Sequence, residues 1–498
     1  MKTEDGELVI GVDVGTSGVK VLLARADGSV LRTADASHGF ATPRPLWAES
    51  DPGDWWDGVV AALSQLLEGI DRDRLRAIGL TGQMHGLVAL DRHGRVVCPC
   101  IMWNDQRTGE ECREIEEEVG VERLIERSGN RMLAGFTAPK VRWLRKHRPD
   151  VHKDMARVLL PKDYIRYRLS GVFATDVADA SGTGMLDVGR RTWCGELVAA
   201  AGAEMEWLPE VVESAAVAGR VSAAGAAATG LPEGLPIVAG AGDQAAGAVG
   251  CGIVREGRIS VTLGTSGVVF AHSETFQSDP GGRLHAFCHA VPGRWHLMGV
   301  MLSAAGSYQW LADKVFPGLS FRELDALAAK APAGCEGLSF MPYLAGERCP
   351  HADPLARGGL VGLTLRHGRE HIARAVLEGV AFGLRDSLEL MRPLGIRASE
   401  VVATGGGVAS PLWRSILADT LGCELTVPLT NQGGAHGAAL LAAVGAGLQP
   451  DVEAACAGVL DGASRVVPDA AGSQTMERHY RKFRMLYPAC REFFHEPD

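Results

Sequence analysis

Two short loops of identical sequence contain the first residues whose types could handle phosphate. The run Gly15-Thr16-Ser17-Gly18-Val19 recurs as Gly264-Thr265-Ser266-Gly267-Val268, half of the 498-residue chain later. Glycine lets a backbone turn tightly and approach a ligand, and successive N–H groups then form an anion-binding concavity to which hydroxyls add donors. The Walker A pattern is absent, which argues against a P-loop NTPase. An ordinary hairpin turn is the alternative for either loop alone. The repeat instead predicts that Gly15, Thr16 and Ser17, with Gly264 and Thr265, hold the phosphates of ATP.

Asp13 stands two residues before the first loop, at the end of the apolar run LVIGVDV. A lone carboxylate in such a place is costly unless it is paired or bound to a metal. Because Mg²⁺ keeps several waters and takes few protein carboxylates, Asp13 is predicted to hold Mg²⁺ or its water shell beside the phosphates. A turn or cap role is the alternative.

Asp243 follows a predicted strand, 235–240, and opens a predicted helix. Phosphoryl transfer to a hydroxyl needs a carboxylate within hydrogen-bond reach of that hydroxyl, and a helix N-terminus favours the ionised form. Asp243 is therefore a candidate general base, with simple helix capping as the alternative. The stretch 240–245 also matches the dinucleotide pattern G-x-G-x-x-A. The chain lacks the acidic residue that should end a second strand about 20 positions on, which argues against a nicotinamide enzyme.

The elements around the two loops predict two similar halves. The first loop lies between the β patterns 8–14 and 19–26, and the second between 258–263 and 268–272. Internal repetition of this kind, with strands alternating with helices around glycine turns, indicates α/β domains. We expect domains at 1–253 and 254–498 with a cleft between them. Further expected elements are helices at 54–70 and 370–392, a strand at 399–404 running into Gly405-Gly406-Gly407, and a helix capped by Ser410 with Pro411 in its first turn.

Composition narrows the class of protein. The formal charge is −10 and the pI is near 5.9, so the chain should repel nucleic acid and anionic membranes. The longest apolar stretch, 236–253, is interrupted by Asp243 and is not a membrane span. The 11 cysteines are scattered and odd in number, which favours a reducing compartment and a cytoplasmic location.

Longer motifs resemble a known family. The stretch GFTAPKVRWLRKH from Gly135 to His147, and a second one from Gly358 through Glu378, are similar to the two signatures of the FGGY carbohydrate kinases. The two phosphate loops, Asp13, the GAGDQ stretch and the glycines near 405 agree with them. The resemblance covers nearly the whole chain. It implies two similar actin/hexokinase-like (ribonuclease H-like) α/β ATPase domains with a central cleft.

Within that family the chain most resembles the members that phosphorylate xylulose. The segments that carry this likeness are 45–52, 81–86, 103–107, 160–164, 288–305 and 343–351. They imply ATP-dependent conversion of D-xylulose to D-xylulose 5-phosphate, with Asp243 as general base, ATP and Mg²⁺ as the cofactors and a homodimer as the family expectation. The alternatives are a kinase for ribulose, gluconate or glycerol, or a non-catalytic ATP-binding sensor of actin type.

The resemblance also implies roles for individual residues. Met84 and His85 would contact the sugar, Trp103 and Asp105 would wall its pocket, and Gln244 would make a further sugar or water contact. Taken alone, Trp103 and His85 are more typical of a core and a structural histidine. The residues expected near the adenosine are Gly405, Gly406, Ser410 and Ala435.

The chain departs from the family pattern at three positions. Gln244 stands where Asn is common, Cys349 where Thr is common, and His436 where an apolar residue is common. The longer amide of Gln244 changes the local sugar or water contact that the family pattern implies.

Overall fold

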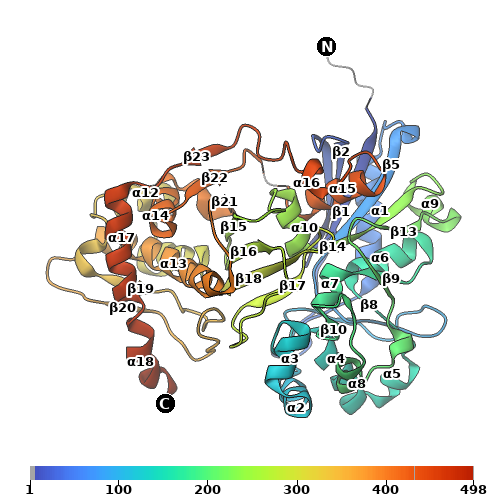
Figure 1. The fold of residues 1–498 in the computed structure, drawn as a ribbon, viewed down its shortest axis with the longest axis horizontal. Coiled ribbons are helices and arrows are strands. Elements are labelled where there is room, and N and C mark those ends of the chain that lie inside the picture. The colour runs from blue at the N-terminus through green and yellow to red at the C-terminus, as the bar shows by residue number, and fades with distance from the viewer. Residues whose placement is uncertain (1–5, 431, 497–498) are drawn as a thin grey trace.

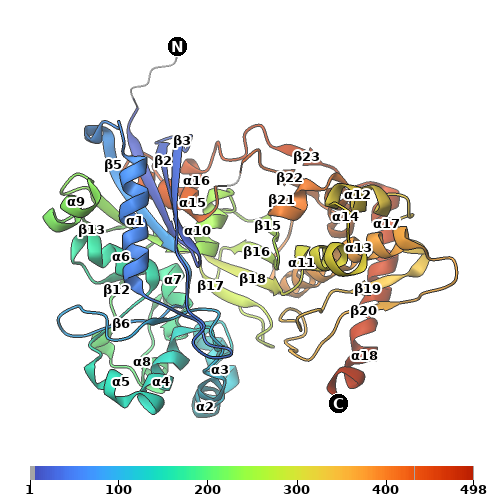
Figure 2. The same ribbon diagram turned by 180° about the vertical axis from the view of Figure 1, so that it is seen from behind.

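The computed structural model describes residues 6–430 and 432–496 and divides into two α/β halves, seen side by side in Figure 1 and from behind in Figure 2. A six-stranded sheet forms the centre of the first half, and a seven-stranded sheet forms the centre of the second. The α/β class and the two-half architecture expected from the repeat are confirmed. The strand order is β13 (Val217–Arg220), β14 (Pro236–Gly242), β5 (Leu75–Gly82), β1 (Leu8–Val14), β2 (Gly18–Arg25), β3 (Val30–Ser37) in the first sheet, and β17 (His285–Cys288), β18 (Trp295–Met301), β16 (Gly267–Ser273), β15 (Arg258–Leu263), β21 (Glu400–Thr404), β22 (Glu424–Val427), β23 (Ser464–Val466) in the second.

The repeated loops close equivalent hairpins. β1 pairs antiparallel with β2 and parallel with β5, and β15 pairs antiparallel with β16 and parallel with β21. In the first hairpin Asp13 lies opposite Lys20. The predicted strand–loop–strand units are therefore confirmed, and each loop lies at the end of a central, buried strand.

Helix boundaries follow local capping chemistry. α1 (Pro52–Leu66) begins two residues earlier than expected, because the Asp51 side chain accepts the Gly53 N–H and Pro52 suits the first turn. α14 (Pro411–Leu421) begins as expected, with Ser410 Oγ accepting the Trp413 N–H. The longest helix, α13 (Arg369–Met391), has 23 residues. None of the helices within 6–430 and 432–496 combines the length and apolarity needed to cross a membrane.

One helix from the end of the chain lies on the first sheet. α15 (Gly434–Gly445) packs against β1, β5 and α10 (Asp243–Gly250), and Figures 1 and 2 both show it beside the early strands. The backbones nearly touch: a Cβ atom built on Gly11 would lie 1.9 Å from the Ala435 carbonyl oxygen, and one on Gly79 would lie 2.0 Å from that of Ala438. The proposed division at residue 253 therefore separates the two sheets, while α15 packs across it.

The contact between α15 and the sheet generates a stability prediction. Gly79→Ala places a methyl group inside the space of the Ala438 carbonyl, so we expect the free energy of unfolding to fall by about 1–3 kcal/mol or more, as in other overpacked cores. Urea unfolding followed by circular dichroism measures the change. Gly247→Ala on α10 is the control, because a Cβ there meets nothing within 4 Å and a helical Gly→Ala change should stabilise by roughly 0.5–1 kcal/mol. Equal stability of Gly79→Ala and wild type would contradict the contact.

Candidate active site

A cavity of about 180 Å³ is lined by both halves of the molecule. Asp243, Gln244, Met84, His85 and Trp103 line it from the first half, as expected for a base and a sugar pocket. The second half contributes, among others, Ser266, His285 and Arg348. The structure thus brings residues from positions 84 to 348 around one space.

Asp243 is the first residue of α10, directly after β14. Burial raises the pKa of Asp243 to about 7, and the negative charge of Asp13 adds to the effect. Burial likewise raises the pKa of Asp13 to about 6, opposed by the Lys20 ammonium. A carboxylate with a pKa near the working pH is suited to general-base catalysis.

Asp13 lies where a hydrated cation and phosphates would fit. Within the described parts of the chain its buried Oδ1 has no hydrogen-bond partner. A Cβ built on Gly434 would lie 3.0 Å from its Oδ2, so the N-terminal end of α15 reaches this carboxylate. An unsatisfied carboxylate oxygen beside a phosphate loop suits Mg²⁺, and the positive end of a 12-residue helix favours nearby phosphate. The residues present therefore fit Mg²⁺ with a nucleotide.

The first phosphate loop is linked to the cavity by a side-chain hydrogen bond. The Gly15 N–H donates to the Gly18 carbonyl at 2.9 Å, which closes the turn, and Trp103 Nε1 donates to Thr16 Oγ1 at 3.0 Å. Trp103 is 44% exposed, so it is no core residue. In the second loop the Thr265 carbonyl accepts the N–H groups of Ala304 and Gly306. Both loops are thus held in place by groups outside them.

The residues expected near adenosine lie around the second hairpin and α15. Gly405 has a φ of +90°, and a Cβ there would lie 2.5 Å from the Leu263 carbonyl oxygen, so this turn touches the strand that leads into the second loop. Gly406 begins a short 3₁₀ turn that ends at the cap Ser410. The Ser410 hydroxyl is used by the cap and Ala435 is fully buried, so their contact with a nucleotide stays a prediction.

His85 presents a bare nitrogen to the cavity. Its Nδ1 lies 2.6 Å from the Gly182 carbonyl oxygen, which only accepts, so Nδ1 carries the proton. Burial lowers the pKa of His85 to about 3, which keeps the ring neutral and leaves Nε2 as an acceptor. The ring stacks on Phe136 at a centroid distance of 4.9 Å. This arrangement suits a sugar hydroxyl, and the ring is not enclosed in the core.

The side chains of Met84 and His85 occupy space that two glycines, Gly182 and Gly242, leave open. A Cβ on Gly182 would lie 2.5 Å from His85 Nδ1 and 2.9 Å from Met84 Cε. A Cβ on Gly242 would lie 2.6 Å from Met84 Cγ. Met84 therefore fills the space beside the backbone that leads into Asp243, and its thioether supplies an apolar surface next to that carboxylate.

Asp105 does not line the cavity. Its fully buried carboxylate accepts the Ala48 N–H at 2.7 Å and a forked contact from Arg107, whose guanidinium lies 3.5 Å from the Trp47 ring centroid. The expectation that Asp105 walls the sugar pocket is therefore corrected. Arg107, two residues along the chain, pairs with the Asp105 carboxylate. This pair fixes the turn that carries Trp103.

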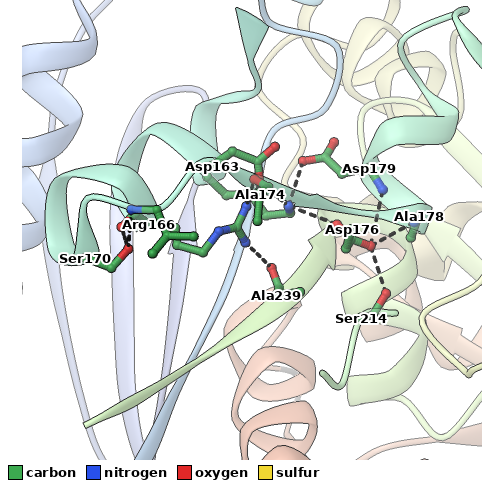
Figure 3. Close-up of polar contacts among 11 residues, drawn as sticks. Asp163, Arg166, Ser170, Ala174, Asp176, Ala178, Asp179, Ser214 and Ala239 are labelled. Atoms are coloured by element: carbon green, nitrogen blue, oxygen red, sulfur yellow. Dashed lines mark hydrogen bonds and ion pairs between the residues drawn. The ribbon is translucent and has the colours of Figure 1, made fainter. Parts of the chain in front are cut away.

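A group of buried charges lies behind the site, between α6 (Pro161–Ser170), β9 (Ala174–Asp176) and β14 (Figure 3). Lys162 Nζ lies 2.7 Å from Asp163, 2.9 Å from Asp176 and 3.3 Å from Asp179. Arg166 contacts Asp163 and donates to the carbonyls of Ala174 and Ala239. All these side chains are excluded from solvent. We call them the buried charge cluster: Lys162, Asp163, Arg166, Asp176 and Asp179.

The buried charge cluster connects to both sides of the cavity. Ala239, which accepts from Arg166, lies on β14 shortly before Asp243. Asp176 caps α7 (Val177–Ser181), accepting from the Ala178 and Asp179 N–H groups, and α7 ends at Gly182, whose carbonyl holds His85. The segment 160–164 contributes to the family resemblance, but no role was predicted for its charged residues. The alternation of Lys, Arg and three Asp residues within a short stretch is the signal that could have found it.

Comparison with known proteins identifies the family. Models of the FGGY family of carbohydrate kinases match residues 8–250 as the N-terminal domain and 259–446 as the C-terminal domain. The chain belongs to the FGGY family of carbohydrate kinases. This FGGY kinase is 42% identical to the xylulose kinase of Escherichia coli (strain K12) over 88% of its own length and 90% of the relative's. It is 36% identical to the xylulose kinase of Bacillus subtilis (strain 168), over 98% and 96%. The crystal structure of xylulose kinase from Rhodospirillum rubrum superimposes with a TM-score of 0.93 at 35% identity, covering 98% and 100% of the two chains.

The position of His85 generates a prediction about sugar binding. Gly182→Ala pushes a methyl group against the His85 ring and Met84, so we expect the KM for sugar to rise at least tenfold while the KM for ATP stays within twofold. Steady-state kinetics with each substrate varied in turn measure both constants. Gly195→Ala is the matched control, because its Cβ meets nothing within 4 Å. An unchanged sugar KM in Gly182→Ala would show that the sugar does not use His85.

The two neighbouring aspartates generate a pH prediction. A base must be ionised to accept a proton, so kcat/KM for sugar should fall as the pH drops through about 7. Asp13→Asn removes the neighbouring negative charge, so the pKa of Asp243 falls and the acid limb of the residual activity moves to lower pH. Profiles of kcat/KM from pH 5 to 9 for both proteins test this. A limb at the same pH in both proteins would contradict coupling between the two carboxylates.

Proposed function

We propose that this FGGY kinase transfers the γ-phosphoryl group of ATP to D-xylulose, giving D-xylulose 5-phosphate. The observation that carries the proposal is Asp243, a carboxylate with a pKa near 7 in a cavity that it shares with Met84, His85 and Trp103. The relatives named xylulose kinase support the choice of sugar, because the alignment with them runs over most of both chains.

Asp243 acts as general base in this proposal. Its carboxylate accepts the proton of the terminal sugar hydroxyl while that oxygen bonds to the γ-phosphorus of ATP. The bond from the γ-phosphorus to the β–γ bridging oxygen breaks, and the electron pair leaves with ADP. The proton stays on Asp243 until product departs, which a pKa near 7 permits.

The remaining cavity residues bind and orient the sugar. The bare Nε2 of His85 accepts a hydrogen bond from a hydroxyl, the Gln244 amide supplies both a donor and an acceptor, and Met84 with Trp103 covers the apolar face of the sugar. Asp105 acts indirectly in this proposal: its pair with Arg107 holds the turn that carries Trp103.

The nucleotide lies on the other side of Asp243 in this proposal. The loop residues Gly15, Thr16 and Ser17 in the first half and Gly264 and Thr265 in the second bind the phosphates. Asp13 would hold Mg²⁺, which when bound neutralises phosphate charge. The adenosine would lie along Gly405, Gly406, Ser410 and Ala435.

The alternatives share the nucleotide apparatus and differ at the cavity. A kinase for ribulose, gluconate or glycerol would keep Asp243 and change the sugar preference. A non-catalytic ATP sensor would bind ATP without sugar-dependent turnover, and it would leave a raised-pKa base in a sugar-sized cavity without a use.

We also propose a cytoplasmic location and a homodimer. All 11 cysteines are free thiols, which fits a reducing compartment. The dimer rests on the family resemblance, and light scattering of the purified protein tests it.

Coupled ADP-release assays test the function. We expect strong preference for D-xylulose over L-xylulose, D-ribulose, L-ribulose, glycerol and gluconate. Asp243→Ala should lower kcat by about 10²–10⁴-fold, the usual contribution of a positioned base, with an unchanged melting temperature. Preference for another polyol would replace the substrate and keep the kinase. Binding of ATP without any sugar-dependent turnover in wild type would favour the sensor.

A further inference from the structure

Arg348 is a cavity residue that belongs to the second half and that the mechanism above does not use. It lies on the loop between β19 (Ser339–Met341) and β20 (Gly359–Val361). The backbone on either side is fixed: Glu347 is buried and its Oε1 accepts the N–H groups of Leu302 and Arg348, and the Cys349 N–H donates to the Val300 carbonyl at 3.0 Å. The side chain between these anchors is exposed and lines the sugar cavity.

The guanidinium of Arg348 has donors to spare. Nη1 lies 3.4 Å from His285 Nε2, and this is the one side-chain hydrogen bond of Arg348 within the described ranges. No carboxylate in those ranges lies within ion-pair distance of the guanidinium. A guanidinium carries five N–H donors and cannot give up its charge. A cation without a carboxylate in a partly closed cavity is a binding group for an oxygen-rich ligand.

A chain of hydrogen bonds sets which way His285 faces. The Asn130 amide nitrogen donates to the carbonyls of Ser128 and Ala286, so its Oδ1 is the atom 2.9 Å from His285 Nδ1 and accepts from it. His285 Nε2 therefore carries a lone pair and accepts the hydrogen bond from Arg348 Nη1. Because Asn130 belongs to the first half, this chain holds Arg348 against the first half at one end of the cavity.

That end is the one occupied by His85. The rings of Phe136 and Phe287 both contact His85, at centroid distances of 4.9 and 6.2 Å, and His285, at 6.2 and 5.4 Å. Arg348, bonded to His285, therefore lies near His85, and burial together with the charge of Arg348 lowers the pKa of both histidines.

Met84 lies between His85 and the backbone that leads into Asp243. A Cβ on Gly242 would lie 2.6 Å from Met84 Cγ, and one on Gly182 would lie 2.9 Å from Met84 Cε and 2.5 Å from His85 Nδ1. Asp243 and Arg348 therefore mark different ends of the cavity, with Met84 and the two histidines between them.

We propose that Arg348 binds the end of the sugar remote from the transferred phosphoryl group. His85 Nε2 accepts from one hydroxyl, while two N–H groups of Arg348 donate to neighbouring oxygens. For a 2-ketopentose phosphorylated at its terminal hydroxyl, these are the keto oxygen and the C1 oxygen. The guanidinium is a pure donor that matches an acceptor-only keto oxygen. This inference rests on the proposed function for the identity of the sugar, and on the cavity alone for the role of Arg348.

Substitution of Arg348 separates sugar binding from chemistry. Arg348→Met should raise the KM for sugar about 10–100-fold, the range expected for losing charge-assisted hydrogen bonds, while kcat and the KM for ATP stay within about threefold. Arg348→Lys keeps the positive charge and loses the planar pair of N–H donors, so it should give an intermediate KM for sugar. If the Met variant does not fold, the Lys variant still tests the proposal. Arg357→Met on the same loop is the matched control, since that side chain is exposed and donates to the loop carbonyls of Pro354 and Ala356.

A truncated substrate locates the contact on the sugar. With 1-deoxy-D-xylulose, which lacks the C1 hydroxyl, the penalty of Arg348→Met should shrink at least threefold relative to D-xylulose, because part of the contact is already missing. An equal penalty with both sugars, or an unchanged KM in both variants, would overturn the proposal. A collapse of kcat at constant KM would overturn it too, and would assign Arg348 to the phosphoryl group. If wild type prefers another sugar of the panel, the proposed function fails, and the KM effects on that sugar still decide the role of Arg348.

Discussion

The buried charge cluster is the constraint on which the geometry of the site depends. Burying ions is expensive unless each finds good partners, and removal of one partner leaves an uncompensated charge. Burial and the neighbouring Asp163 and Asp176 raise the pKa of Asp179 well above its usual range, although Lys162 opposes this. Lys162 lies within ion-pair distance of Asp163, Asp176 and Asp179, and Arg166 contacts Asp163. The cluster ties together α6, β9, α7 and β14. Of these elements, α7 leads to the Gly182 carbonyl that contacts His85, and β14 leads to Asp243.

The end of the cavity beside Asp13 and Asp243 carries negative charge that no side chain of the described residues there neutralises fully. Asp13 and Asp243 are both partly buried, their pKa values are both raised, and the charge of Asp13 acts on Asp243. The N-terminal ends of α10 and α15 partly offset this charge, since helix N-termini are positive. A cation at Asp13 would offset this negative charge.

Local sequence predicted the parts of the molecule that depend on neighbours in the chain. The two hairpins, the Ser410 cap and the strand 8–14 that carries Asp13 follow from short patterns, and the structure confirms them. Asp105 was expected in the pocket because the family resemblance implied that role for the segment 103–107. The Asp105 side chain does not line the cavity, because its carboxylate is paired with Arg107 and with the Ala48 N–H.

Contacts between distant segments were beyond the reach of sequence patterns. His285 meets Asn130 across 155 positions, and Arg166 meets Ala239 across 73. No periodicity or motif spacing encodes such pairs, so Arg348 and the buried charge cluster had no predicted role. The packing of α15 on the first sheet was hidden for the same reason. A glycine within a strand, such as Gly11 or Gly79, indicates a bulge or a close backbone approach, but it does not say which segment approaches.

The small residues of α15 determine how the two aspartates lie relative to each other. A Cβ on Gly437 would lie 1.8 Å from the Ala246 carbonyl oxygen of α10, so the two helices touch backbone to backbone. α10 begins with Asp243, and the first turn of α15 reaches Asp13. On its other side α15 rests on β1, which carries Asp13, and on β5. Larger side chains at these contacts would move α10 away from β1 and separate the carboxylates. Close packing of glycine and alanine therefore maintains the electrostatic coupling that raises the pKa of the proposed base.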